Sequence, residues 1–526
     1  MIGRHKRSDI IIDLPTISRS HAVLTRYDDG SWTISDIGSK GGVQVNGQDT
    51  ALCALEPGDV ISLNGLEMTL EPITENQEAY QTTLRTKAGK DFHPSVTLVL
   101  LSLFQILMNL QLLFGAEPED MGHMVLGFGA IFAVQWLLFA FYCAIRRKGY
   151  EVETIAFFLS TLGMAIIATA DPGEAGKQIA AMVLGLILFL FIGWSLRDLE
   201  RAKKVRYLAA GFGLLLLAVN LVFGVEKFGA KNWIQIGPMS FQPSELVKLA
   251  FILAGAATLD RLFAKRNLIF TVLFSAYCVG CLALMSDFGT ALVFFVAFLC
   301  IAFLRTGDLA SIVMMTAAAG FAGGLVLHFK PYVAQRFTVW RHAWEFTQTT
   351  GYQQSRTMSA AASGGLFGTG PEDAWLKYVG AANTDLVFGV VSEEFGLLLA
   401  LVCVGAVMAL AVFALRSGDS ARSGFYAIAA CAAASMLIFQ TTLNVLGAVD
   451  ILPLTGVTFP FVSMGGSSML SCWGLLAYLK AADVRLPPEE KSPEDKPEKP
   501  APKREGFFED MPEIPVDEIF GKEGRS

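Results

Sequence analysis

Charged residues and cysteine are scarce in this sequence. Asp, Glu, Lys and Arg make up 17% of its 526 residues, against about 25% in average proteins, while 53% are hydrophobic. Its eight cysteines are scattered, and the pair spaced as CxxC, Cys278 and Cys281, has no second pair or histidine nearby, which argues against a metal or redox centre. The net charge of −7 provides no basic excess for nucleic acid. These shortages exclude a soluble enzyme and a nucleic-acid-binding protein.

The hydrophobic residues are concentrated in the middle of the chain, which divides it into four predicted parts. Residues 95–480 hold apolar segments of about 20 residues, the length that crosses a bilayer. They follow a polar region, 1–72, and a linker, 73–94. The last part, 481–526, mixes proline with Glu and Lys and cannot bury enough apolar surface to fold, so we predict a disordered tail. The expected fold class is a polytopic α-helical membrane protein.

We predict twelve transmembrane helices. Clusters of Lys and Arg, such as Arg146–Lys148 and Arg197–Arg206, occupy alternate gaps, and the other gaps are acidic or nearly neutral. The basic gaps should face the cytoplasm, and an even number of segments then places both termini there. The lack of a signal peptide agrees with a cytoplasmic N-terminus. The segments are 95–114, 122–144, 154–171, 177–195, 205–224, 241–259, 267–285, 288–304, 308–328, 385–415, 424–447 and 460–480.

Short apolar stretches alternate with turns in the N-terminal region. Ser31–Ile34 and Val43–Val45 alternate apolar and polar residues, and the dipeptides Asp29-Gly30 and Asn46-Gly47 are typical of hairpin turns. The pattern predicts short antiparallel strands and an all-β domain at residues 1–72.

A few charged residues interrupt the apolar segments. Asp287 stands between two of them, and two interpretations stay open: a functional carboxylate near the membrane, or an N-cap of the following helix. Glu245 and Lys248 are three residues apart on one helix face, which favours a structural ion pair.

The segment from Phe329 to Asn383 is the longest predicted outer loop, and it is unusually rich in Lys and Arg. It is either a solvated loop or a site for an anionic headgroup such as a lipid-linked pyrophosphate. Its glycine-rich stretch, Gly364–Gly370, is flexible enough to bring backbone N–H groups to a phosphate.

Five segments carry a family resemblance: GAKNWIQIGPMSFQPSELVKLAFIL (229–253), SDFGTALVFF (286–295), GYQQSRTMSAAASGGLFGTG (351–370), NTDLVFGVVSEEFG (383–396) and LPLTGVTFPFVSMGGSSML (452–470). In the same order, they resemble the RodA/FtsW/SpoVE (SEDS) family of peptidoglycan glycosyltransferases. That family usually has ten spans, three of them before the tryptophan-containing loop. Five precede Trp233 here, so the resemblance implies two additional N-terminal helices.

The resemblance implies an enzyme that polymerises peptidoglycan glycan chains from lipid II, an undecaprenyl-pyrophosphate-linked disaccharide-pentapeptide, on the outer leaflet of a bacterial plasma membrane. Asp287 matches the family's catalytic aspartate. The reaction needs a base for the attacking hydroxyl and positive charge for the leaving pyrophosphate. A divalent cation, Mg or Mn, could share the second task, although no carboxylate cluster has a convincing ligand spacing. The implied substrate-binding residues are Lys231, Trp233, Arg336, Arg341, Gln353, Arg356, Asp385, Ser463, Ser467 and Ser468.

The sequence departs from the family in three motifs. Phe288 replaces the Leu that usually follows the aspartate. The Gln-Ser pair usually found four and five residues after the Tyr is Arg356-Thr357 here, and the aromatic residue often found before Gly465-Gly466 is Met464. We expect the last two changes to alter contacts with the substrate headgroup and to leave the proposed base in place.

The N-terminal region has a resemblance of its own, carried by Gly3-Arg4, Ser18–His21, Asp36–Ser39 and Val45–Gly47. These residues resemble a forkhead-associated (FHA) domain, a family that binds phosphothreonine through an Arg and a Ser. The family's Asn-Gly-Thr is Gly41–Val43 here, which loses an amide that typically holds the peptide backbone. The family's first strands would precede Gly3, so the question whether this domain is incomplete stays open. The implied phosphopeptide-binding residues are Arg4, Ser18, Arg19 and Asn46.

The implied partners are a class B penicillin-binding protein, which would supply transpeptidation, and a Ser/Thr kinase or its phosphothreonine substrate. Two alternatives stay open: a transporter that flips lipid II, which many helices and midplane charges also suit, and a non-catalytic scaffold that recruits proteins through the FHA domain. The sequence has no clear internal repeat, and its distinctive loops lie on the predicted outer face, which favours outer-leaflet chemistry. A role in division, elongation or sporulation stays open.

Overall fold

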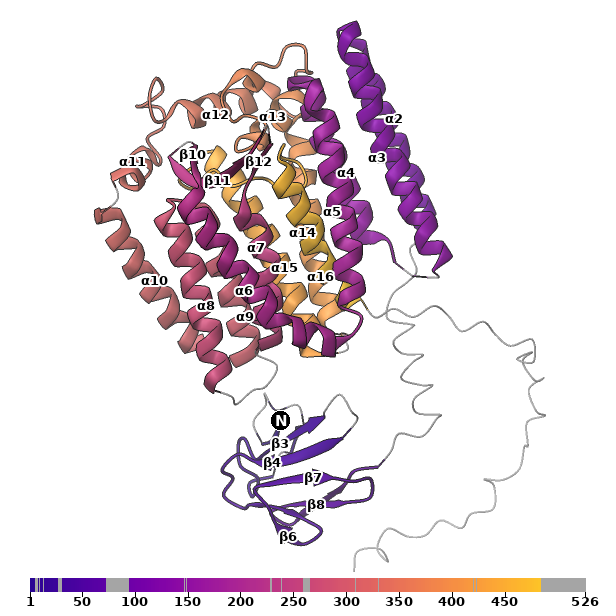
Figure 1. Ribbon diagram of the computed structural model, residues 1–526, viewed down its shortest axis with the longest axis vertical. Helices are drawn as coiled ribbons and strands as arrows, with labels where there is room; N and C mark the ends of the chain where they lie inside the picture. Colours follow the sequence, from indigo (N-terminus) through magenta and orange to yellow (C-terminus); the bar gives the residue numbers. More distant parts are fainter. Residues whose placement is uncertain are drawn as a thin grey trace, which may run out of the picture. The chain divides into compact units, whose positions relative to one another are not determined.

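The computed structural model describes residues 1–483 except 5–7, 9, 13, 27–30, 72–93, 146, 148, 228, 238, 259–264, 308, 330, 420 and 422. The predicted linker and tail therefore lie almost wholly outside the described residues. The described part of the chain holds an N-terminal β-domain and a helical membrane domain (Figure 1), which confirms the expected fold class.

Two sheets form the N-terminal domain. One has the strand order β2-β1-β3-β4-β7 and the other β6-β5-β8-β9, and apart from the parallel pair β1–β2 the neighbours are antiparallel. Buried side chains from both sheets, among them Ile34 and Leu63, form one core between them. The strands are β1 (Ile2–Gly3), β2 (Ile10–Ile11), β3 (Ala22–Arg26), β4 (Trp32–Asp36), β5 (Val43–Val45), β6 (Gln48–Asp49), β7 (Leu52–Leu55), β8 (Val60–Leu63) and β9 (Leu66–Thr69).

The membrane domain is a bundle of helices with one small antiparallel sheet, β10-β11-β12. Its helices are α2 (Pro94–Phe114), α3 (Pro118–Ala144), α4 (Glu151–Ala170), α5 (Ala175–Ser195), α6 (Leu199–Phe223), α7 (Pro243–Thr258), α8 (Lys265–Leu284), α9 (Phe288–Thr306), α10 (Leu309–Phe329), α11 (Pro331–Val339), α12 (Tyr352–Gly364), α13 (Val387–Glu394), α14 (Leu397–Asp419), α15 (Gly424–Ala448) and α16 (Gly466–Ala482). Two 3-10 turns, Pro172–Glu174 and Leu376–Tyr378, and the strands β10 (Val225–Lys227), β11 (Ala230–Ile236) and β12 (Met239–Phe241) complete it.

Each of the twelve predicted segments contains a helix. Among the described residues, eight helical segments are long and apolar enough to cross a membrane, and two shorter apolar stretches lie in α8 and α10. The two remaining helices, α7 and α16, have 16 and 17 residues and are packed inside the bundle. The protein is therefore a multi-pass membrane protein.

The predicted segment 385–415 is not one helix, because the chain breaks between α13 and α14. Gly396 has a φ of +92°, which only glycine adopts readily, and a Cβ there would lie 2.3 Å from the carbonyl oxygen of Leu366. The close approach of these two backbones forces the break. The sequence does not indicate the break, because the residues on either side of it are apolar.

The glycine-rich stretch 364–370 is the segment that packs against this break. Its N–H groups at Thr369 and Gly370 donate to the carbonyl oxygens of Glu393 and Glu394, at 2.8 and 3.1 Å. These two donors are therefore occupied by the backbone of α13 and are not presented to a phosphate.

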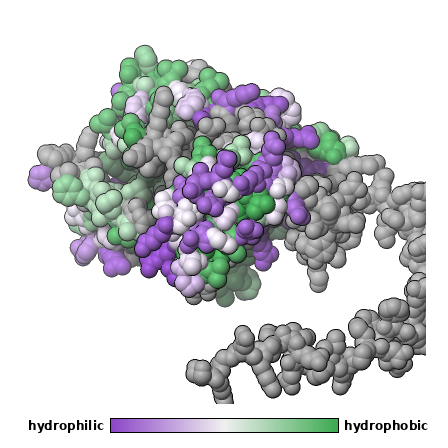
Figure 2. Space-filling view, turned by 90° about the horizontal axis from the view of Figure 1, so that it is seen from below, coloured by the Kyte–Doolittle hydropathy of each residue, from purple (hydrophilic) through white to green (hydrophobic). Residues whose placement is uncertain are grey.

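Polar side chains join the first two helices, α2 and α3, to α4. The amides of Gln105 and Gln135 form a reciprocal pair at 2.9 and 3.0 Å, and Gln105 also donates to the hydroxyl of Thr161 at 3.1 Å. Such buried polar contacts hold helices together where apolar surfaces face lipid. The outward side chains of α2 and α3, such as Leu103 and Leu137, are exposed and apolar. On the face drawn in Figure 2, hydrophobic and hydrophilic patches alternate.

Candidate active site

Asp287 begins α9 at the tight connection from α8. Its side-chain oxygen Oδ1 accepts the backbone N–H of Thr290 at 3.1 Å, so the carboxylate caps the helix. The residue before it, Ser286, has a φ of +62°, a conformation that costs energy for a non-glycine residue and that clusters at functional sites. Asp287 is only 7% exposed. It is an N-cap, and it is also a buried carboxylate held in a strained turn.

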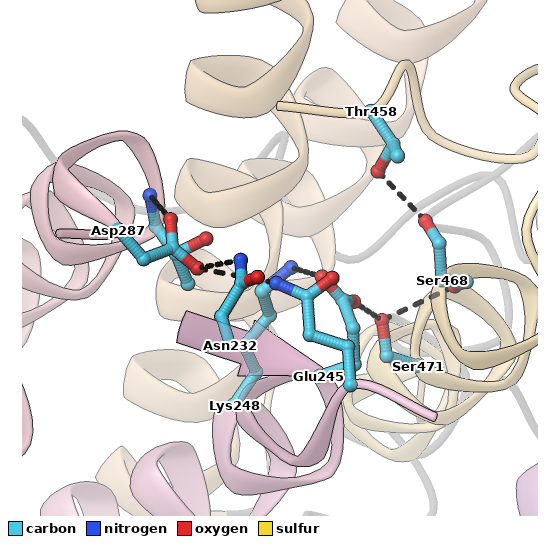
Figure 3. Close-up of polar contacts among 9 residues, drawn as sticks. Asn232, Glu245, Lys248, Asp287, Thr458, Ser468 and Ser471 are labelled. Atoms are coloured by element: carbon cyan, nitrogen blue, oxygen red, sulfur yellow. Dashed lines mark hydrogen bonds and ion pairs between the residues drawn. The ribbon is translucent and has the colours of Figure 1, made fainter. Parts of the chain in front are cut away.

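Two amides hold the other oxygen of Asp287. Asn232 Nδ2 donates to Oδ2 at 2.7 Å, and Gln242 Nε2 donates to the same oxygen at 3.2 Å (Figure 3). Asn232 lies on β11, and the N–H of Lys231 donates to the carbonyl oxygen of Met285, which fixes this strand beside the turn. A carboxylate has about four lone-pair positions. Among the described residues, three are taken, and one on Oδ1 remains.

Asp287 and Arg336 both lie within electrostatic reach of Asp385. Burial raises the pKa of Asp385, which stands in the turn before α13, to about 6; Thr384 and the Arg336 guanidinium lower this pKa, and the charge of Asp287 raises it further. The two carboxylates and the guanidinium thus form one charged group, built from the beginnings of α9 and α13 and from α11.

The segment from Leu452 to Thr458 connects these three charges. Arg336 donates to the carbonyl oxygen of Leu454 at 2.9 Å. On the opposite side, a Cβ on Gly456 would lie 3.2 Å from Asp385 Oδ2, and a Cβ on Gly289, two residues after Asp287, would lie 2.5 Å from Val457. The close packing requires glycine at position 289, and the φ of +72° favours glycine at position 456.

A polar cavity of about 240 Å³ opens beside Arg336. Gln353, a predicted substrate-binding residue, lines it and donates to the carbonyl oxygen of Gly380 at 2.9 Å. The cavity is large enough for a sugar ring and offers amides, a hydroxyl and a guanidinium. Its lining residues are Gln335, Arg336, Val339, Thr350, Gln353, Gln354 and Leu454.

Four other predicted substrate-binding residues belong neither to the charged group nor to the lining of the cavity. Lys231 is exposed, and its Nζ donates to two carbonyl oxygens at the end of α6. Trp233 is half-buried on β11. Arg341 and Arg356 lie over the rings of neighbouring aromatic residues, at 5.6 and 5.3 Å. Among the described residues, no hydrogen bond joins any of these four to Asp287.

The predicted serines support the site from below the Leu452–Thr458 segment. Ser463 accepts the N–H of Phe459 at 2.8 Å and donates to the carbonyl oxygen of Thr384 at 2.6 Å. Ser468 bonds Thr458 at 2.8 Å, and Ser467 is buried in the first turn of α16. In the structure, Ser463 and Ser468 hold backbone segments in place.

Glu245 and Lys248 form a buried ion pair next to this group. Lys248 Nζ lies 2.7 Å from Glu245 Oε1, both side chains are at most 5% exposed, and Ser471 of α16 donates to the second oxygen of Glu245. Figure 3 shows the ion pair, with Ser471 and Ser468 on the neighbouring helix. The ion pair therefore neutralises Glu245 inside α7, and the bond from Ser471 joins α7 to α16.

The predicted phosphopeptide-binding residues lie in two places in the β-domain. Arg4 and Arg19 are exposed, and the N–H of Arg4 donates to the carbonyl oxygen of Ser18 at 3.0 Å. Ser18 Oγ accepts the N–H of Lys40 at 3.0 Å. Asn46, by contrast, donates to Asp59 and accepts the N–H of Val60 within its own sheet.

Asn232 and Gln242 are site residues that the sequence did not reveal. Both fall inside the segment 229–253, but neutral amides in a hairpin interrupt no apolar pattern, unlike a carboxylate. Their role depends on where β11 docks. Among the described residues, no group of three His, Cys, Asp or Glu side chains could hold a metal ion.

A sequence model of the FtsW/RodA/SpoVE family, described as cell cycle proteins, matches residues 154–486. The chain belongs to this family. A second model, of the FHA domain, matches residues 1–64, so the SEDS-family chain carries an FHA domain as well. Helices α2 and α3 precede the region covered by the SEDS match.

Curated relatives of this SEDS-family chain are named peptidoglycan glycosyltransferases. RodA of Mycobacterium leprae (strain TN) is 29% identical over 388 residues, which is 67% of this chain and 82% of that protein. A probable FtsW of Tolumonas auensis is 32% identical over 349 residues, 62% of this chain and 90% of that protein. A solved structure, described as structural coordination of polymerization and crosslinking by a peptidoglycan synthase complex, has 26% identity and a TM-score of 0.55 over 64% of this chain and 97% of that one. The expected family and enzyme class are confirmed.

Proposed function

We propose that the protein extends peptidoglycan glycan chains from lipid II, with Asp287 as the general base. The observation that carries this proposal is the carboxylate of Asp287, buried, fixed by three donors and left with one lone-pair position on Oδ1 among the described residues. A base must be held in hydrogen-bond reach of the proton that it takes, and fixed donors hold this carboxylate in one orientation.

On this proposal, Asp287 accepts the proton of the attacking sugar hydroxyl. A sugar hydroxyl of the acceptor attacks the anomeric carbon of the donor, the new C–O bond forms, and the bond to the lipid pyrophosphate breaks. The hydroxyl proton passes to Asp287 Oδ1, and the pyrophosphate leaves with the electron pair. Arg336, whose guanidinium lies beside the cavity and near Asp385, provides positive charge for the leaving group.

The predicted substrate contacts divide into two sets on this proposal. Arg336, Gln353 and Asp385 line or charge the cavity and contact the sugar-pyrophosphate. The remaining four, Lys231, Trp233, Arg341 and Arg356, meet the more distant parts of the substrate. Ser463, Ser467 and Ser468 act by holding the Leu452–Thr458 segment.

The experiment that tests the function uses purified full-length protein in detergent with lipid II, with and without a class B penicillin-binding protein. The expected product is a ladder of glycan polymers on a gel. Polymer formed without vesicles excludes both a flippase and a scaffold as the sole function, because neither makes a new glycosidic bond. If no polymer forms under any of these conditions, the proposed function is wrong.

We also propose the partners and the orientation expected from the sequence. A class B penicillin-binding protein would supply crosslinking, as in the peptidoglycan synthase complex to which the membrane domain is similar. The FHA domain would read a phosphothreonine protein or a Ser/Thr kinase, with both termini in the cytoplasm. Cysteine labelling of single-cysteine variants from either side of the membrane tests the orientation: labelling of the β-domain from outside intact cells would contradict it.

A further inference from the structure

The FHA domain has glycine at position 41 because a side chain distant in sequence fills the space beside it. A Cβ on Gly41 would lie 2.5 Å from both Cβ and Cγ of Asn64 and 2.9 Å from its Nδ2, closer than side chains approach. Gly41 is not among the glycines with a positive φ, so its backbone would accept any residue. Glycine is needed at position 41 because the Asn64 carboxamide occupies the space of its side chain.

Asn64 is anchored in that place. It lies in the turn between β8 and β9 with a φ of +50°, a conformation that asparagine tolerates better than most residues. Its Nδ2 donates to the carbonyl oxygen of Thr16 at 2.9 Å. The side chain thus joins the loop before β3 to the loop that holds Lys40 and Gly41, next to the bond from Lys40 N–H to Ser18 Oγ.

The carboxamide of Asn64 keeps most of its bonding capacity. An asparagine side chain has two N–H donors and a carbonyl oxygen with two lone pairs. Among the described residues, only Thr16 bonds it, and Asn64 is exposed. One N–H and the oxygen therefore stay available on an exposed side chain, and together they are the donor and acceptor that match the C=O and N–H of an extended peptide backbone.

The surroundings of Asn64 are suited to an anion. Ser18 lies two residues from the anchoring carbonyl of Thr16, and Arg4, Arg19 and Lys40 are exposed around Ser18. A phosphate bound at Ser18 and these cations would place the following peptide residues beside the Asn64 carboxamide.

We propose that Asn64 holds the backbone of a phosphothreonine peptide bound to the FHA domain, so that the amide missing at position 41 is supplied from the β8–β9 turn. The proposal rests on phosphothreonine binding by this domain. It makes Gly41 and Asn64 a complementary pair: one residue provides the space, and the other provides the amide.

The test measures peptide binding to the full-length protein in detergent. An oriented library of fluorescein-labelled phosphothreonine peptides selects the tightest binder, and its unphosphorylated twin is the background probe. Asn64→Gly keeps the left-handed turn without strain and should weaken the phosphopeptide about tenfold, the value of one to two peptide hydrogen bonds. The double variant Gly41→Asn with Asn64→Gly returns an amide to the same space and should recover most of the affinity.

A matched control separates the amide from simple filling of space. Gly41→Ala with Asn64→Gly adds a Cβ without an amide and should remain as weak as Asn64→Gly alone. The inference is overturned if Asn64→Gly binds like the natural chain, or if the alanine double variant recovers affinity as well as the asparagine one. Binding of no phosphothreonine peptide by the natural chain would refute the proposed sensing function itself, and thermal unfolding of each variant shows whether the domain is folded.

Discussion

Replacing Asn232 by alanine should slow glycan polymerisation strongly, because it removes the shortest hydrogen bond to Asp287. The 2.7 Å bond from Nδ2 to Oδ2 is lost, while the donors from Gln242 at 3.2 Å and Thr290 at 3.1 Å remain. A hydrogen bond to a charged group contributes about 1.5–3 kcal/mol. At about 1.4 kcal/mol for each tenfold change in rate, we expect a loss of roughly 10- to 150-fold.

The assay is the initial rate of glycan formation from lipid II by purified protein in detergent. Gln242→Ala removes the longer bond and should give a smaller loss. Asn109→Ala, the same substitution on α2, should leave the rate unchanged. A rate for Asn232→Ala within about twofold of the natural chain, with the thermal unfolding temperature preserved, would refute the reasoning that fixed donors orient the base.

Three further results are expected. Burial raises the pKa of Asp385 from 3.8 to about 6, so ionising this carboxyl costs the folded protein at most about 3 kcal/mol relative to the unfolded chain. The free energy of unfolding should therefore fall as the pH rises from 4 through 6. Asp385→Asn removes this cost and should raise the unfolding temperature at pH 8 but not at pH 4. Arg336→Ala should lower the polymerisation rate more than Arg336→Lys, which keeps the charge; equal rates would contradict a role in charge stabilisation. Lys248→Met should lower the free energy of unfolding by about 3–5 kcal/mol, because it leaves Glu245 buried and without its cation. The double variant Lys248→Met with Glu245→Leu should lower it much less, and thermal unfolding measures both.

Three charged residues, Asp287, Glu245 and Lys248, could be predicted from the sequence pattern because each interrupts an apolar segment, whereas Arg336 and Asp385 came only from the family resemblance. Asp287 stands between two membrane segments, and the Glu245–Lys248 spacing places both on one helix face. The two interpretations of Asp287 are compatible, because a carboxylate that caps α9 through one lone pair of Oδ1 keeps another for a proton. A buried charge is costly, so its position is visible in the sequence before any contact is known.

The neutral partners could not be predicted, because their positions depend on tertiary contacts. Asn232 reaches Asp287 only because the N–H of Lys231 bonds Met285. The break before α14 depends in the same way on the approach of two backbones at Gly396. Asn64 lies 23 residues from Gly41, and only the folded sheets bring its amide to that space.

The central claim is that Asp287 is the base of a glycan polymerase, and the Asp287→Asn variant tests it most directly. Asparagine can still cap α9, so the unfolding temperature should change little, but it cannot take the hydroxyl proton. Because a general base typically contributes about 10²- to 10⁴-fold, the rate of polymer formation from lipid II should fall by at least about a hundredfold. A folded Asp287→Asn protein that polymerises lipid II at the rate of the natural chain would contradict the account.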